Sequence, residues 1–159
     1  MKILIVSDTH RKNDNYFKVL DLQKPLDMVI HCGDTEGSED ILTEAADCPV
    51  HIVTGNNDFF SNLPRELELD IGKYKVLVTH GHNYYISMGN EMLKREAVAR
   101  GIDIVLYGHT HRPVIDQKNG VIAVCPGSIS YPRQEGRRPS YAIMEIDEEG
   151  EVHFTISYL

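Results

Sequence analysis

The stretch Ile104-Val105-Leu106-Tyr107-Gly108-His109-Thr110-His111 joins an apolar run directly to two histidines. Its three aliphatic residues are typical of a buried strand. Gly108 then favours a loop, because glycine adopts backbone angles that other residues avoid. In a loop, both histidines can reach the same region. Alone this is a weak signal, since two solvated loop histidines have the same spacing.

The same arrangement recurs elsewhere in the chain. Four further strand-like runs end in polar side chains: Lys2–Val6 before Asp8-Thr9-His10, Met28–His31 before Gly33-Asp34, Val50–Val53 before Gly55-Asn56-Asn57-Asp58, and Lys75–Val78 before His80-Gly81-His82. In open α/β sheets, binding sites form at the carboxyl ends of the strands. We therefore expect these polar side chains to gather at one edge of a sheet.

The first third of the chain alternates strands with helices. Asn13 or Asp14 can cap a helix that runs to about Gln23, where Lys24-Pro25 ends it. Ser38 can cap a second helix whose inward residues would be Ile41, Leu42 and Ala45. This alternation predicts a parallel sheet with crossover helices.

The later part is rich in strands. The alternating segments 67–71 and 74–78 form a hairpin around Gly72-Lys73, and Asn119-Gly120 marks another two-residue turn. A helix over about 90–100 would place Met92, Leu93 and Ala97 together and end at Gly101. The last two strands are expected near 141–146 and 152–158. The whole pattern predicts one α/β domain over residues 1–159, in which two mixed sheets pack face to face with helices outside, a four-layer sandwich.

Composition limits the classes of protein. Hydrophobic residues make up 42% and charged residues 25% of the chain, as in ordinary globular domains. No apolar run approaches the ~20 residues of a membrane helix, and the first apolar run meets Ser7-Asp8 too early for a signal peptide. The three cysteines form no Cys-x-x-Cys pair, which favours a reducing compartment. We therefore expect a cytoplasmic protein without membrane contacts.

The polar residues at the strand ends can bind metal ions. Their side chains are carboxylates, imidazoles and one amide: Asp8, His10, Asp34, Asn56, His80, His109 and His111. Imidazole and carboxylate together suit Zn, Mn, Fe or Ni. Seven ligands exceed one tetrahedral site but fit two sites if a carboxylate bridges them, and two metals ~3.5–4 Å apart can clamp a phosphoryl group. The alternative, separate loops with ordinary surface histidines, is hard to reconcile with five such strand ends.

Taken in order, these motifs resemble the motif set of the calcineurin-like metallophosphoesterases, and most closely the small YfcE-type phosphodiesterases. The resemblance runs from residue 1 to the Pro126-Gly127-Ser128 loop and implies a two-sheet sandwich flanked by helices. It also implies that Asp8, His10 and His111 hold one metal, that Asn56, His80 and His109 hold the second, and that Asp34 bridges them. A hydroxide between the two metals would then attack phosphorus. Mn²⁺ is the expected metal, with Ni²⁺, Zn²⁺ or Fe²⁺ as alternatives.

One position departs from the wider superfamily pattern. Many members carry a histidine where this chain has Asn57, and that histidine is thought to protonate the leaving oxygen. Asparagine cannot do so, and general acid catalysis contributes ~10²–10⁴-fold. This favours phosphodiesters over monoesters, as in the YfcE-type pattern. His82 could substitute, although orienting His80 is the more natural role.

Partners and alternatives follow from the same features. Arg11, Asn57 and Arg133 are candidate substrate contacts, and a small phosphodiester is the expected substrate. A formal net charge of −8 opposes binding of a long polyanion, which counts against a nuclease using the same site. A non-catalytic scaffold is the other alternative, because one branch of this fold, typified by a retromer subunit, uses it for protein contacts. A homodimer is possible.

Overall fold

The computed structural model describes residues 1–159 and contains ten strands and three α-helices. The strands are β1 Lys2–Val6, β2 Met28–His31, β3 Val50–Ile52, β4 Glu66–Ile71, β5 Tyr74–Thr79, β6 Ile104–Leu106, β7 Pro113–Asp116, β8 Ile122–Pro126, β9 Ser140–Ile146 and β10 Val152–Tyr158. The helices are α1 Asp14–Gln23, α2 Glu39–Glu44 and α3 Glu91–Ala99, and two 3₁₀ turns, His82–Tyr84 and Ile86–Met88, precede α3.

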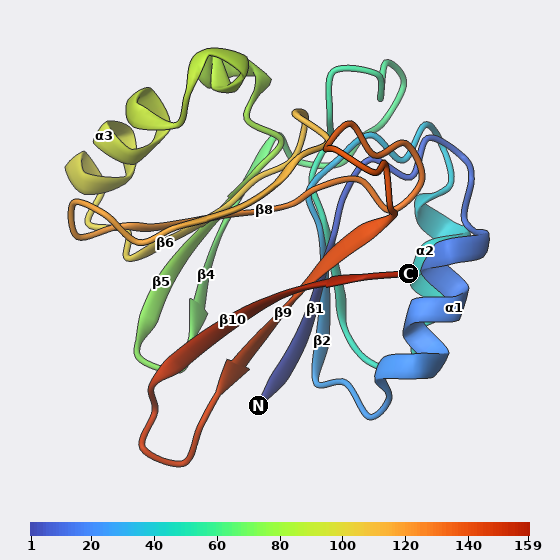
Figure 1. Ribbon diagram of the computed structural model, residues 1–159, viewed down its shortest axis with the longest axis horizontal. Coiled ribbons are helices and arrows are strands. Elements are labelled where there is room, and N and C mark those ends of the chain that lie inside the picture. Colours follow the sequence, from blue (N-terminus) through green and yellow to red (C-terminus); the bar gives the residue numbers. More distant parts are fainter.

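The strands form two five-stranded sheets that pack face to face (Figure 1). The first has the order β10-β9-β1-β2-β3 and the second the order β4-β5-β6-β8-β7. Both are mixed: β1, β2 and β3 are parallel, as are β5, β6 and β8, while the remaining pairs are antiparallel. Helices α1 and α2 cover the first sheet and α3 covers the second (Figure 1). The predicted fold class is therefore confirmed.

The central strands are apolar on both faces because both faces are covered. On β1, Ile3 and Ile5 belong to the core between the sheets, whereas Leu4 and Val6 pack under α1 and α2. On β5, Val76 and Val78 face the core between the sheets. All of these side chains are fully buried. This explains why their sequences are continuous apolar runs and do not alternate with polar residues.

Two turn predictions are confirmed by backbone angles. Gly101 follows α3 with a φ of +66°, the left-handed conformation that ends a helix. Asn119 and Gly120 have φ values of +59° and +77°, as a two-residue hairpin turn requires.

Details of the helices differ from the predictions. Ile41 and Met92 are exposed, at 55% and 52%, so their predicted inward positions were wrong. Neighbouring residues on a helix point about 100° apart, and each helix presents only a narrow face to its sheet, which Leu42 and Leu93 occupy. The side chain of Ser38 does not cap α2, because its hydroxyl donates to the carbonyl of Thr35 at 2.6 Å. None of the helices has the length and hydropathy needed to cross a bilayer.

Substitution on α2 tests how this helix is oriented. Leu42 is fully buried among residues of β1 and β2, so Leu42→Ala should lower the free energy of unfolding by about 2–5 kcal/mol. Ile41→Ala is the matched control on the exposed face and should cost less than about 0.5 kcal/mol. Urea denaturation measures both, and equal losses would contradict this orientation.

Candidate metal centre

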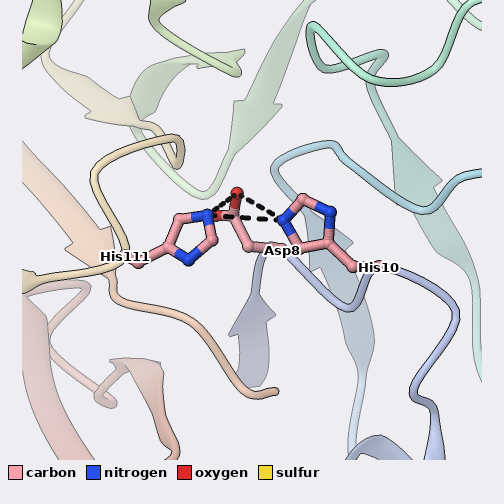
Figure 2. Close-up of side chains that lie close together, drawn as sticks. All are labelled: Asp8, His10 and His111. Carbon is pink, nitrogen blue, oxygen red and sulfur yellow. Dashed lines mark hydrogen bonds and ion pairs between the residues drawn. The ribbon is translucent and has the colours of Figure 1, made fainter. Parts of the chain in front are cut away.

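Two groups of metal-competent side chains meet where β1, β2, β5 and β6 end. Asp8, His10 and His111 form one group, and Asp8, Asp34 and His80 form the other. Within each group the ligating atoms lie within 4.8 Å of one another. Figure 2 shows the first group, in which both rings turn toward the Asp8 carboxylate. Asp8 Oδ1 lies 3.0 Å from His111 Nε2, which lies 3.4 Å from His10 Nε2.

Asp34 lies between the two groups. Its Oδ2 atom is 3.7 Å from His10 Nε2 and 3.4 Å from His80 Nε2. Beyond it, Asn56 Oδ1 lies 3.1 Å from His80 Nε2 and 2.8 Å from His109 Nδ1. The structure thus brings all seven predicted ligands into one continuous cluster.

The two sheets contribute different ligands. Asp8, Asp34 and Asn56 follow β1, β2 and β3 of the first sheet, whereas His80 and the His109–His111 loop follow β5 and β6 of the second. Carboxylates and the amide therefore meet imidazoles across the end of the sandwich, with His10 as the imidazole of the first sheet.

Three of the histidines turn Nε2 toward the carboxylates. In each, Nδ1 faces an oxygen that can only accept a hydrogen bond: His10 at 2.6 Å from Glu36 Oε1, His80 at 2.7 Å from the Cys32 carbonyl, and His111 at 2.7 Å from the Tyr131 carbonyl. Nδ1 therefore carries a proton in each ring, and Nε2 is the nitrogen that faces the carboxylates. A cation at Nε2, either a proton or a metal ion, offsets the negative charge of these oxygens. Asp8 Oδ1, moreover, is buried and accepts no hydrogen bond. These donors fit divalent metal ions.

The charges of the cluster point the same way. Burial alone would raise the pKa of Asp8, but His10 and His111 hold it well below its usual range. His80 and Asn57 likewise outweigh burial and lower the pKa of Asp34 to about 2. Both carboxylates are thus ionised at neutral pH. Asp8 and Glu36 in turn overcome burial and raise the pKa of His10 to about 9. The field that draws a proton to this site also draws a divalent cation, whose binding releases the proton.

The backbone at the cluster is strained. Five of the seven predicted ligands have φ angles between +44° and +69°, a region that residues with side chains rarely adopt: Asp8, His10, Asp34, His109 and His111. Strain of this kind persists where the surroundings enforce it and concentrates at functional sites. Gly108 shows how tight these surroundings are, because a Cβ there would lie 2.0 Å from Ser7 Oγ and 3.1 Å from the Cys32 carbonyl.

Asp58 organises the loops that carry two of the ligands. Its buried carboxylate accepts from four donors: Asp34 N–H at 2.8 Å, Gly55 N–H at 2.7 Å, Thr35 Oγ1 at 3.2 Å and Glu36 N–H at 2.6 Å. It thereby joins the loop after β2 to the loop after β3. Asp58 belongs to the Gly55-Asn56-Asn57-Asp58 motif, but the motif does not reveal which groups the Asp58 carboxylate binds.

Two further residues support the centre and were not predicted. Glu36 orients His10 through Nδ1, as described above. Ser128 donates to the Asp8 carbonyl at 2.8 Å and accepts from the amides of Ser130 and Tyr131. The sequence indicated this role only through the Pro126-Gly127-Ser128 loop, which does not reveal that Ser128 contacts Asp8.

The predicted auxiliary residues lie around the cluster. Asn57 turns toward Asp34, to which its backbone N–H and its Nδ2 each donate at 2.8 Å. Arg11 donates from Nε to the Glu36 carbonyl at 2.6 Å. Arg133 lines a cavity beside His10 and His111. The His82 ring lies 5.5 Å from the His80 ring, so the two make contact.

His31 has a structural role. It is fully buried, accepts from Gly33 N–H at 3.1 Å and lies 3.2 Å from Thr9 Oγ1. Burial lowers its pKa to about 4, which keeps the ring neutral. It therefore supports the loop before Asp34.

A two-sheet sandwich with such a cluster at its strand ends defines a class of metal-dependent hydrolases, and comparison with known proteins identifies the family. The family model described as calcineurin-like phosphoesterase superfamily domain matches residues 1–149. Probable metallophosphoesterase YsnB of Bacillus subtilis is 33% identical over 150 residues, covering 94% of this chain and 86% of that protein. Phosphodiesterase MJ0936 of Methanocaldococcus jannaschii is 30% identical, covering 80% and 83%.

Solved structures agree with this. A Streptococcus pneumoniae protein described as a predicted phosphoesterase superposes with a TM-score of 0.81 at 30% identity, covering 99% of this chain and 97% of that one. The chain therefore belongs to the calcineurin-like phosphoesterase superfamily, and the expectation of a metal-dependent phosphoesterase is confirmed. Vps29 from Entamoeba histolytica shares the fold. It superposes with a TM-score of 0.78 at 24% identity, covering 100% of this chain and 99% of that one.

Asp58→Asn tests the organising carboxylate. Both carboxylate oxygens of Asp58 accept hydrogen bonds, so the NH₂ group of asparagine would face a donor whichever way the amide is turned. We therefore expect a loss of about 2–4 kcal/mol in the free energy of unfolding and weaker metal binding. Asp40→Asn removes the same charge at an exposed position of α2 and is the matched control. Urea denaturation and calorimetric metal titration measure the two effects. Wild-type metal affinity in Asp58→Asn would contradict this role.

Proposed function

We propose that this protein is a phosphodiesterase that uses two divalent metal ions. Asp8, His10 and His111 would hold the first ion, Asn56, His80 and His109 the second, with Asp34 shared. The observation that carries this proposal is the position of Asp34 Oδ2, which faces Nε2 of His10 at 3.7 Å and of His80 at 3.4 Å. Mn²⁺ is the proposed metal, and two such ions would supply an activated water and neutralise charge on the phosphoryl oxygens.

The protein's own residues fix the geometry of this site. Nδ1 of His10, His80 and His111 is anchored by oxygen acceptors, so each ring is held with Nε2 toward the centre. The two donors of Asn57 hold both oxygens of Asp34. Ligands whose orientation is set before substrate arrives lose little freedom on binding.

The environment of Asn57 supports diesters as substrates. Its amide is used on Asp34, and asparagine has no proton to give near neutral pH. Without a general acid at this position, cleavage depends on the stability of the departing oxygen. Phosphodiesters with good leaving groups are therefore the proposed substrates, and phosphodiesterase MJ0936 is a relative named for this activity.

Two alternatives have specific support. The fold shared with Vps29 is compatible with a non-catalytic scaffold, but all seven donors of the cluster are present here. A nuclease could use the same site, yet a net charge of −8 opposes a long polyanion. An enzyme that acts on small diesters accounts for both the seven donors and the net charge of −8.

Metal reconstitution tests the proposal. Chelator-treated protein should not hydrolyse bis(p-nitrophenyl) phosphate, and Mn²⁺ should restore turnover. Asp34→Asn should lower the restored rate by about 100-fold or more, because even groups that only support metal ligands contribute 10–100-fold. Asp40→Asn is the control and should behave as wild type. Metal binding without turnover by any of Mn²⁺, Ni²⁺, Zn²⁺ or Fe²⁺ would favour the scaffold.

A histidine at position 57 tests the missing acid. Asn57→His should raise the ratio of p-nitrophenyl phosphate to bis(p-nitrophenyl) phosphate hydrolysis by about 10-fold or more, since a positioned acid contributes ~10²–10⁴-fold. Asn57→Ala controls for loss of the hydrogen bond to Asp34 and should leave that ratio unchanged, although both rates fall. Equal ratios in the two variants would remove the support that Asn57 gives to the diester preference.

A further inference from the structure

A cavity of about 700 Å³ opens directly beside the metal centre. Its lining includes His10, His111 and Glu36 together with three arginines, Arg112, Arg133 and Arg137. We call this cavity the arginine pocket. It concentrates positive charge at one place on a chain whose formal net charge is −8.

The guanidinium groups of the arginine pocket have no acidic partner. The ion pairs of lysines and arginines in this chain all involve other residues: Lys24, Lys73, Lys94 and Arg100. Glu36 is the one carboxylate that lines the pocket, and its oxygen already accepts from His10 at 2.6 Å. Three cations without a counterion, in a protein with 24 acidic residues, leave the pocket ready to receive an anion.

The pocket is tied to the metal centre through the backbone. Arg112 directly follows His111, and the N–H of Arg133 donates to the His111 carbonyl at 3.0 Å. His111 in turn donates from Nδ1 to the Tyr131 carbonyl at 2.7 Å. One set of hydrogen bonds thus positions a predicted metal ligand and the arginines, so an anion in the pocket has a defined place relative to the centre.

The pocket also continues away from the metals. A second cavity of about 560 Å³ shares Arg112 and Arg133 with it and extends to Met88 and Val114. A substrate whose scissile phosphorus lies at the metal centre can therefore extend past the arginines without meeting a closed wall.

We propose that the arginine pocket binds a second phosphate of the substrate, a terminal phosphomonoester set apart from the scissile diester. This inference rests on the proposed phosphodiesterase function and narrows its substrate class to diesters that carry such a group. Guanidinium is suited to the task because its planar fork of N–H donors matches phosphate oxygens in pairs. A phosphomonoester dianion is also attracted more strongly by the three unpaired arginines than a neutral or singly charged substituent is.

Two matched substrates test the proposal. Thymidine 5′-(4-nitrophenyl phosphate) has the scissile diester alone, whereas thymidine 3′-phosphate 5′-(4-nitrophenyl phosphate) adds one phosphate and keeps the leaving group. With the Mn²⁺-loaded protein, the ratio of their kcat/KM values should favour the second by about ten-fold or more, the usual contribution of a charge-assisted contact. Arg112→Gln, Arg133→Gln and Arg137→Gln should each reduce this ratio about ten-fold, mainly through KM.

Arg138→Gln is the matched control. Arg138 lies next to Arg137 in the chain, but its guanidinium packs over the Tyr158 ring at 5.1 Å and does not line the pocket. This variant should keep the wild-type ratio. A ratio near one in the wild-type protein, or equal effects of Arg137→Gln and Arg138→Gln, would overturn the proposal.

Binding separates this inference from the proposed function. Calorimetry with metal-free protein should show that thymidine 3′-monophosphate binds about ten-fold more tightly than thymidine, and that the three pocket variants abolish the difference. If neither diester is hydrolysed with any metal, the phosphodiesterase proposal fails while this measurement still decides whether the pocket holds a phosphate. Equal binding of thymidine and its 3′-monophosphate would overturn the pocket proposal.

Discussion

The carboxylate of Asp58 is the constraint on which the centre depends. Four donors from two loops converge on it, and it is buried where water cannot replace them. A charged acceptor of this kind makes stronger hydrogen bonds than a neutral one, and an unpaired donor in its place would be costly. Because Asp34 and Asn56 lie in those loops, the spacing between them is set by a residue outside the predicted ligand set.

The same logic holds for the imidazoles. Carbonyl oxygens of Cys32 and Tyr131 and the carboxylate of Glu36 select the tautomer of three rings, and the tautomer decides which nitrogen faces the centre. Left-handed backbone angles at five ligands show that the loops are held against their own preference. The loops thus hold conformational strain, and a bound divalent cation would offset the negative charge of the two carboxylates.

Much of this could be predicted from the sequence. Continuous apolar runs predicted the central strands, and the polar residues after them predicted a single cluster. Both features can be recognised locally, because an apolar run and the side chains that follow it are adjacent in the sequence. The orientation of Ile41 and Met92 could not be predicted, since a helix that contacts its sheet along a narrow face allows more than one rotation. The partners of Asp58, Glu36 and Ser128 depend on loops that meet only after folding. Arg112 and Arg137 lie 25 residues apart, and no spacing rule joins them.

The division of ligands between the two sheets has a mechanical consequence. One sheet supplies Asp8, Asp34 and Asn56, and the other supplies His80, His109 and His111. Cations held by these donors would link the two sheets at this end of the sandwich. Metal binding and the packing of the two sheets would then be coupled, so that each favours the other.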